Sequence, residues 1–406
     1  MAKTIKKLTP EAGRTDAAGL RAYDADALAR CVADAKQPWW RRAACVEALA
    51  GRVPERRVAR LIACVQDTDD VSHVRVALLG LLSDRPELLP WLRHEDREQD
   101  GKYGMAEAVL GARGALGDLT AAGALATLAF DLWRGRRETG EAGIDGLVAR
   151  HGVEAVPAQL GEARPEDRSL AVRLRDRAGE DVTDALADPD PQVAFRAQEL
   201  LTDPQRLRGY LAEAPTEEAK LWAAYALHRL TEDIDETRRL YEELGRPRVE
   251  VTGLDEELRA AIVHEYGRWC EERSDPRWRM ETLCTEPPPA GDRGERLRRA
   301  SAALTAAGLA PRPPISCGED NGVGDDGTYD VIRYGESGDD AVFLSTLGRF
   351  VAGEDDHPQV RRALESAGFR WLDAAVRAIQ VTDLGVYYFG SRGPLGVDTL
   401  VFYWQD

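Results

Sequence analysis

An acidic, glycine-rich segment is the strongest candidate for local chemistry in the sequence. Residues 318–327 contain Glu319, Asp320, Asp325 and Asp326. Oxygen-rich loops with glycines can wrap Ca²⁺, but the spacing does not fit a helix–loop–helix calcium site, since no bidentate Glu closes the segment. A phosphate loop is excluded because the segment has no Lys and its carboxylates would repel phosphate. Three interpretations stay open: a solvated loop, an acidic patch that binds protein, and a cation site.

The histidines and cysteines give no pattern of catalysis or metal binding. None of the six histidines is spaced as H-x-x-x-H or H-E-x-x-H, so a zinc site is unsupported. None of the six cysteines forms C-x-x-C, and Cys45 and Cys64 lie on apolar helical stripes, where a thiol acts as a small hydrophobic group. The segment 390–393 (Gly-Ser-Arg-Gly) lacks the spacing of a nucleophile elbow. We predict no metal, no cofactor and no catalytic residue.

Aromatic and basic side chains on predicted helices offer a second kind of site. They fit either core packing between helices or a row of aromatic anchors on a binding face. The predicted protein-binding residues combine this set with the acidic segment: Trp40, Arg42, Arg75, Trp222, Trp269, Glu319, Asp320, Asp325 and Asp326.

These side chains are positioned by a repeated helical signature. A small or apolar residue recurs at i and i+3, with an apolar residue at i+4, and a basic residue stands three positions before three of these triplets. The triplets are Cys45-Ala48-Leu49, Leu78-Leu81-Leu82, Ala197-Leu200-Leu201, Ala223-Ala226-Leu227 and Ala300-Ala303-Leu304. The pattern predicts helical hairpins, each too small to bury its own apolar face and so requiring a stacked neighbour.

The hairpins resemble the HEAT-repeat family. The matching residues in the first repeats are Leu61-Ile62, Asp67, Asp69, Val74-Arg75, Leu78 and Leu81-Leu82, and the turn Asp188-Pro189-Asp190-Pro191-Gln192-Val193 is similar to the family's inter-helix turn. The resemblance covers about residues 24–305. It implies a mainly α fold, a right-handed α-α superhelix, and a role in binding other molecules along its surface.

The composition changes along the chain predict three regions: a loose N-terminal segment at 1–23, the helical repeats at 24–308 and a small α+β domain at 309–406. Glycines at 101–117 predict an interruption of the helices over 95–120. Within the last region we expect strands at 329–334, 341–347, 386–389 and 400–404, the last two pairing across a hairpin loop. We expect helices at 358–366 and 369–379, with a strand as the alternative at the end of the second.

The net charge of the chain favours some classes of binding partner and disfavours others. The sequence holds 54 Lys and Arg against 71 Asp and Glu, a net charge of −17. This excess disfavours nucleic acid, which is bound through basic residues, and favours a partner with a basic surface. Residues 1–60 are an exception, with 13 basic against 7 acidic residues. Without a secretory signal or an apolar run of about 20 residues, we expect a cytoplasmic protein with reduced thiols.

Two functions follow. The first is non-catalytic protein binding, as a scaffold or as an inhibitor or immunity-type partner of a basic protein. The alternative is an enzyme, because the HEAT-like resemblance also covers DNA glycosylases and chromophore lyases that act in a concave groove. The enzyme would need polar catalytic residues gathered in that groove, whereas the binding protein needs only an extended charged or aromatic face.

Overall fold

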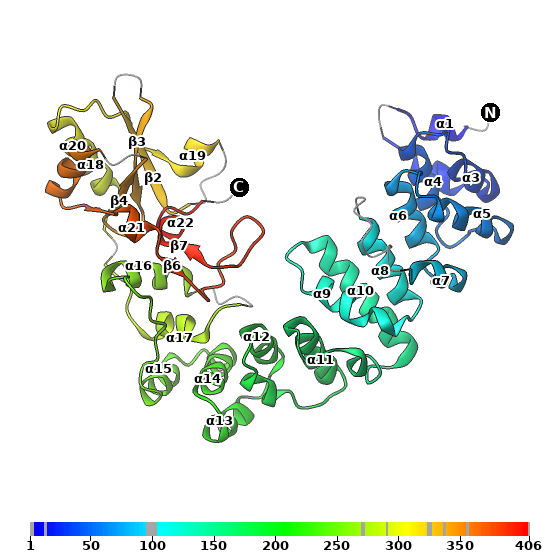
Figure 1. Cartoon of the computed structure of the whole chain (residues 1–406), viewed down its shortest axis with the longest axis horizontal. Coiled ribbons are helices and arrows are strands. Elements are labelled where there is room, and N and C mark those ends of the chain that lie inside the picture. Colours follow the sequence, from blue (N-terminus) through cyan, green and yellow to red (C-terminus); the bar gives the residue numbers. More distant parts are fainter. Residues whose placement is uncertain are drawn as a thin grey trace. The chain divides into compact units, whose positions relative to one another are not determined.

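The computed structural model describes residues 4–11, 14–94, 104–268, 273–289, 291–322, 327–335, 338–354 and 357–404. Within these ranges the chain is mainly helical as far as Ala306 and then forms a mixed five-stranded sheet with short helices (Figure 1). The chain divides into two compact units, Met1–Glu180 and Asp181–Asp406. No helix in the described ranges is long and apolar enough to cross a membrane.

The first unit consists of helices that pack in pairs. They are α1 (Ile5–Leu8), α2 (Ala17–Arg21), α3 (Ala25–Val32), α4 (Trp39–Ala48), α5 (Glu55–Gln66), α6 (Ser72–Leu81), α7 (Leu89–Leu92), α8 (Met105–Ala115), α9 (Ala122–Ala129), α10 (Arg134–His151) and α11 (Pro165–Arg177), with short 3-10 turns between some of them. One core joins α1 to α8 and a second lies among α8 to α11. The triplets Cys45-Ala48-Leu49 and Leu78-Leu81-Leu82 lie at the C-terminal ends of α4 and α6, as the helical pattern predicts.

The predicted loose segment at 1–23 differs from what the structure shows. Within its described residues, α1 and α2 place Leu8 and Leu20 in the core of the first hairpins, with 2% and 1% of their surfaces exposed. Arg41 also donates to the hydroxyl of Thr9. Two apolar side chains and one buried hydrogen bond therefore attach this segment to the helices, although it is too short and polar to show a helical pattern alone.

The predicted interruption at 95–120 is wrong for residues 105–115, which form α8; residues 95–103 lie outside the described ranges. Glycines in this stretch weaken the propensity for a helix, but in the structure they allow two helices to pack closely. A Cβ atom on Gly114 would lie 2.5 Å from the Cα of Gly143 in α10, and one on Gly146 would lie 2.8 Å from the carbonyl oxygen of Gly114. The absence of side chains here lets the backbones of α8 and α10 touch, which offsets the weak helix propensity of glycine.

Asp118 is a buried carboxylate that joins α7 and α8, and it should make stability depend on pH. Arg93, Arg113 and Thr120 all donate to it. Burial alone would raise its pKa, but these bonds lower the pKa of Asp118 from 3.8 to about 2. The carboxylate therefore stabilises the fold above its unfolded pKa, and this contribution disappears as the pH falls toward 2.

We expect Asp118→Asn to lose about 2 kcal/mol of unfolding free energy at pH 7. Urea denaturation of both proteins between pH 7 and pH 3 measures the difference, which should shrink below about pH 5 as the wild-type carboxylate loses its advantage. A difference that stays constant over this range would show that the charge of Asp118 is not the cause.

The second unit begins with helices and ends with the sheet. Its longer helices are α12 (Pro191–Leu200), α13 (Pro204–Glu213), α14 (Glu217–Thr231), α15 (Ile234–Glu243), α16 (Glu256–Tyr266), α17 (Pro276–Cys284) and α18 (Arg293–Ala306). Asp side chains cap the first turns of α12, α13, α15, α16, α17 and α18 by accepting backbone N–H groups. The caps explain why these boundaries are readable from the sequence.

The sheet has the order β1-β2-β3-β4-β5. Its strands are β1 (Ile315–Ser316), β2 (Tyr329–Tyr334), β3 (Asp340–Ser345), β4 (Phe350–Gly353) and β5 (Arg370–Trp371). The first three pairings are antiparallel, whereas β4 and β5 are parallel and joined through α20 (Pro358–Ser366). The predicted strands at 329–334 and 341–347 and the helix at 358–366 are thus observed; β4 was not expected.

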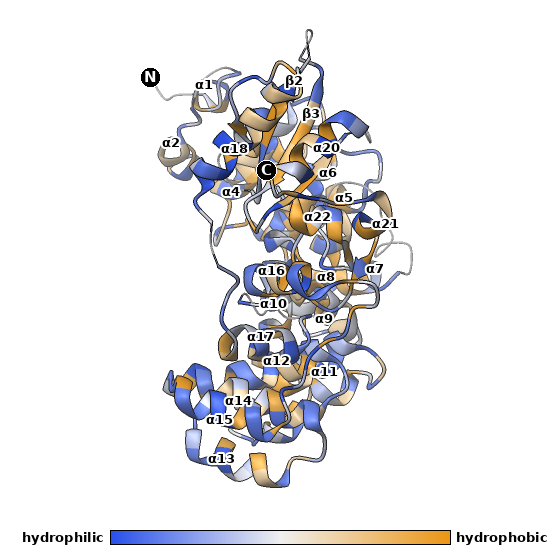
Figure 2. Ribbon diagram, turned by 90° about the vertical axis from the view of Figure 1, so that its left-hand side faces the viewer, coloured by the Kyte–Doolittle hydropathy of each residue, from blue (hydrophilic) through white to orange (hydrophobic). Residues whose placement is uncertain are grey.

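Both faces of the sheet are covered, and its strands are correspondingly hydrophobic (Figure 2). Ile332 and Val342 pack with Ala300 and Leu304 of α18 and with α20 on one face. On the other face, Val331 packs with Cys317 of α19 (Cys317–Asn321) and with the last residues of the described chain. The alternation along β2 therefore separates two layers, as the two-residue period of a strand requires.

Two expectations for the last region are wrong. Residues 369–379 do not form one helix, since they supply β5 and then α21 (Ala374–Arg377) before β6 (Gln380–Val381), which pairs with β7 (Leu395–Gly396). Residues 386–389 and 400–404 do not pair across a hairpin: Tyr388 bridges to Ser391, and Val397–Val401 form the short helix α22. Hydroxyl groups of Thr328 and Ser345 donate to the carbonyl of Val401, so distant residues fix this conformation.

Candidate functional site

Three of the residues predicted to bind a protein are buried. Arg42, Arg75 and Trp222 have 2%, 0% and 2% of their surfaces exposed. Arg42 and Arg75 each donate Nε–H to a carbonyl ten residues earlier, on Val32 and Val65 near the ends of α3 and α5. They satisfy carbonyl groups left open at helix ends. Their role in binding a partner stays a prediction, whereas the structure shows that Arg42 and Arg75 hydrogen-bond to carbonyl groups at the ends of neighbouring helices.

The bonds of these arginines repeat through the chain. Arg42 also forms a two-pronged ion pair with Asp70 in the following hairpin. Arg259 of α16 repeats the arrangement, because it donates to the carbonyl of Val249, again ten residues earlier, and pairs with Glu281 of α17. At two of the three basic positions that precede the triplets, Arg42 and Arg75, the side chain is therefore a structural link between successive helices.

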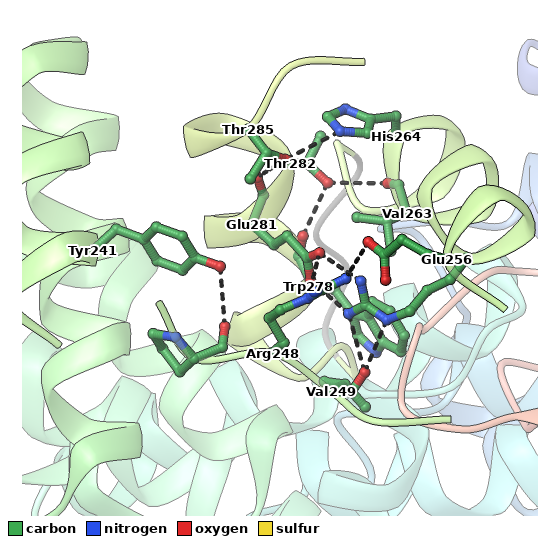
Figure 3. A network of polar contacts seen from close by, with 12 residues as sticks. Tyr241, Arg248, Val249, Glu256, Val263, His264, Trp278, Glu281, Thr282 and Thr285 are labelled. Carbon is green, nitrogen blue, oxygen red and sulfur yellow. Dashed lines mark hydrogen bonds and ion pairs between the residues drawn. The ribbon is translucent and has the colours of Figure 1, made fainter. Parts of the chain in front are cut away.

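The Arg259–Glu281 pair is the centre of a polar network in the second unit (Figure 3). Both residues are buried, with 3% and 5% of their surfaces exposed. Arg248 donates to Glu281 and to the exposed Glu256, and the guanidinium of Arg259 lies 5.4 Å from the ring centre of Trp278. The two arginines both donate to Glu281, so the network ties α16 to α17.

Trp40 lies at the edge of an exposed aromatic group, which we call the Trp39 patch and define as Trp39, Trp40, Val71 and His73. The Trp39 and His73 rings have centres 4.9 Å apart, and Trp39 meets the edge of Trp40. Trp39 and Val71 are among the large hydrophobic residues that remain exposed, at 45% and 42%. The patch is formed by the N-terminal ends of α4 and α6, the same position in two successive hairpins.

Acidic side chains occupy the turn that leads into the Trp39 patch at the start of α6. The turn 67–70 immediately precedes Val71, and Asp67 and Asp69 in it are exposed. Asp70 is already paired with Arg42. Two exposed carboxylates therefore lie in the turn that leads into the Trp39 patch at Val71. Carboxylates and aromatic ring faces both attract a Lys or Arg side chain.

The acidic segment is only partly described. Glu319 and Asp320 belong to α19, where Glu319 and Ser316 form a capping box and Asp320 pairs with Arg333. The solvated-loop interpretation is therefore wrong for these two residues, because they sit in a capped helix and make specific bonds. Asp325, Asp326 and Trp269 lie outside the described residues.

Two cavities open beside α18, both within the second unit. The first, of about 430 Å³, is lined by Glu319, Ser316 and the ion pair of Arg293 with the buried Asp330. The second, of about 400 Å³, lies among α16, α18 and the turn between β3 and β4. Its polar lining includes Arg296, Arg299 and Arg349. None of these three was expected from the sequence, although Arg293, Arg296 and Arg299 are spaced by three along a helix and so share one face.

The acidic groups and thiols show no metal-binding arrangement in the described residues. Cys45 and Cys64 are buried, as predicted. Burial raises the pKa of the Cys64 thiol and raises that of Cys284 to about 11, so both are protonated at neutral pH. No group of three or more His, Cys, Asp or Glu in those ranges is placed to hold a metal ion.

Comparison with known proteins adds no family or fold assignment. No family model matches the chain, and neither a curated protein nor a solved structure matches it. The functional argument therefore rests on the residues themselves.

Proposed function

We propose that the chain is a HEAT-like helical repeat protein that binds a protein partner with a basic surface. The repeated bond of Arg42 and Arg75 supports the repeat, because the two arginines stand 33 residues apart and each reaches a valine carbonyl ten residues earlier. Stacked hairpins of this kind generate extended binding surfaces.

The observation that carries the binding proposal is the exposed contact between the Trp39 and His73 rings, with the exposed Asp67 and Asp69 in the turn that precedes Val71. Large aromatic side chains left in water are costly unless they are covered by a partner, and aromatic anchors dominate protein interfaces. The net charge of −17 adds a long-range attraction for basic surfaces. The partner therefore presents Lys or Arg to the Trp39 patch.

Affinity purification from the native host tests the proposal. We expect wild-type protein to retain a stoichiometric basic protein at low salt and to lose it at high salt. Trp39→Ala should weaken retention at least about tenfold, because an interface anchor is worth about 2 kcal/mol or more. Asp67→Asn combined with Asp69→Asn should weaken it mainly at low salt.

Trp133→Ala is the matched control, since Trp133 is also an exposed tryptophan, at 65%, and precedes α10 in the same unit. It should leave retention unchanged. An equal loss for Trp39→Ala and Trp133→Ala would mean that capture follows general hydrophobicity. If neither Trp39→Ala nor the substitution of both aspartates changes retention of the partner, the proposed surface is refuted.

A further inference from the structure

The cavity among α16, α18 and the β3–β4 turn contains two positive charges with no carboxylate partner. Arg296 is half-buried and uses one nitrogen, Nη1, to donate to the carbonyls of Thr346 and Gly348. Arg299 lies with its guanidinium 4.8 Å from the ring centre of Phe369. In the part of the chain that the structure describes, neither guanidinium forms an ion pair.

The acidic groups around the cavity are already engaged. Glu257 accepts two hydrogen bonds from Arg349, which neutralises both side chains. Glu295 also lines the cavity and pairs with Arg298, whereas Asp292 caps the first turn of α18 through a neutral backbone N–H and keeps its negative charge. Arg296 and Arg299 therefore supply two positive charges against the one carboxylate of the lining, Asp292, for which the described residues show no ion pair.

The position of Arg296 is electrostatically unfavourable as it stands. Burial is the main cause that lowers the pKa of Arg296; the neighbouring Arg293 and Arg299 lower it further, and Asp330 and Asp292 offset part of the effect. Three like charges at successive turns of one helix repel one another and lower its stability. An anion in the cavity would reverse the effect, because it would meet two guanidinium groups at once in a partly water-excluded place.

The two guanidinium groups are held in place by the chain, and part of the cavity lining is apolar. Arg299 is held through its flat face by Phe369, which leaves its edge N–H groups for a ligand. Nε and Nη2 of Arg296 have no acceptor among the described residues. Ala261, Pro288, Leu347 and Phe350 supply an apolar part of the lining, beside the carboxylates named above. A planar carboxylate fits the forked donors, and an apolar group attached to it fits the walls.

We propose that this cavity binds a carboxylate carried on an apolar group, with Arg296 and Arg299 as the anion-binding residues. Two sources share this chemistry, a free organic acid and the C-terminal carboxylate of a peptide that ends in an apolar residue. The cavity is confined to the second unit and does not depend on the Trp39 patch, so each proposal can fail without the other.

Calorimetric titration of the full-length protein tests the site with three probes. N-acetyl-phenylalanine carries the carboxylate, N-acetyl-phenylalanine amide lacks it, and a pentapeptide ending in phenylalanine carries it on a longer chain. We expect saturable binding of the acid and at least a tenfold weaker response to the amide. Tighter binding of the pentapeptide would indicate a peptide terminus, whereas equal binding would indicate a free acid.

Arg299→Gln should weaken binding of the acid about tenfold or more, the usual effect of losing a charge-assisted hydrogen bond. Arg296→Met should abolish binding, and thermal denaturation will show whether it keeps the fold, since Arg296 also bonds to the chain. Arg362→Gln is the control, because Arg362 is an exposed arginine of α20 that donates to the carbonyl of Pro358 and does not line the cavity, and it should bind normally. Equal binding of acid and amide, no saturable binding of either carboxylate, or an equal loss with Arg362→Gln would overturn the proposal.

Discussion

Replacing Glu281 by alanine should destabilise the second unit by about 3–5 kcal/mol, because it leaves the buried guanidinium of Arg259 without its anion. The cost of removing one partner exceeds the net value of the pair, since a buried unpaired charge loses both water and counter-ion. Denaturant unfolding followed by circular dichroism measures it. The double variant Arg259→Met, Glu281→Leu should be more stable than Glu281→Ala, because no charge is then left buried.

Glu256→Ala provides the matched control in the same network. Glu256 also accepts from Arg248, but its side chain is 71% exposed, so its loss should cost less than about 1 kcal/mol. A loss for Glu281→Ala as small as that for Glu256→Ala would contradict a role of the buried pair in tying α16 to α17.

Gly114→Ala should cost the first unit about 3 kcal/mol or more. The added methyl group would lie 2.5 and 2.6 Å from the Cα and carbonyl oxygen of Gly143, and because these are backbone atoms the helices α8 and α10 must move apart. The separation also loosens contacts along the rest of the crossing. Thermal unfolding of the variant measures the effect.

Gly135→Ala tests whether the contact, and not the loss of a glycine, is the cause. Gly135 is exposed in α10, and a Cβ atom there meets nothing within 4 Å. Alanine should therefore leave stability unchanged or raise it by up to about 1 kcal/mol, since it favours the helix. Destabilisation by both substitutions would rule out the crossing as the explanation.

Local signals in the sequence predicted the helices and the place where the sheet begins. The capping residue Asp24 marks the start of α3 by accepting from the N–H of Ala27, and the apolar spacing along α4 to α6 gave their extents. Glycines misled the reading of α8, because a glycine that weakens a helix and one that permits a close helix crossing look the same in one sequence.

The aromatic residues near the C-terminus were misread for a related reason. Leu400 and Val401 end a short helix because Tyr266, Thr328 and Ser345 donate to their carbonyls from positions 56 to 134 residues away. Contacts between residues so far apart in the sequence cannot be predicted from a local pattern. The same limit applies to the candidate sites: the sequence pointed to Trp40, but the pairing of Trp39 with His73 and the convergence of Arg296 with the β3–β4 turn depend on packing.

The packing of the sheet against helices has a consequence for the order in which the chain can fold during synthesis. Leu258 and Trp278 of α16 and α17 share one core with Phe350, Leu372 and Leu400, and α18 shares another with β2 to β4. The first unit can fold as soon as it leaves the ribosome, because the two cores described within it contain no residue later than Leu174. Helices α16 to α18 must instead wait for nearly the last residues, and until then their apolar faces are exposed to chaperones and to aggregation.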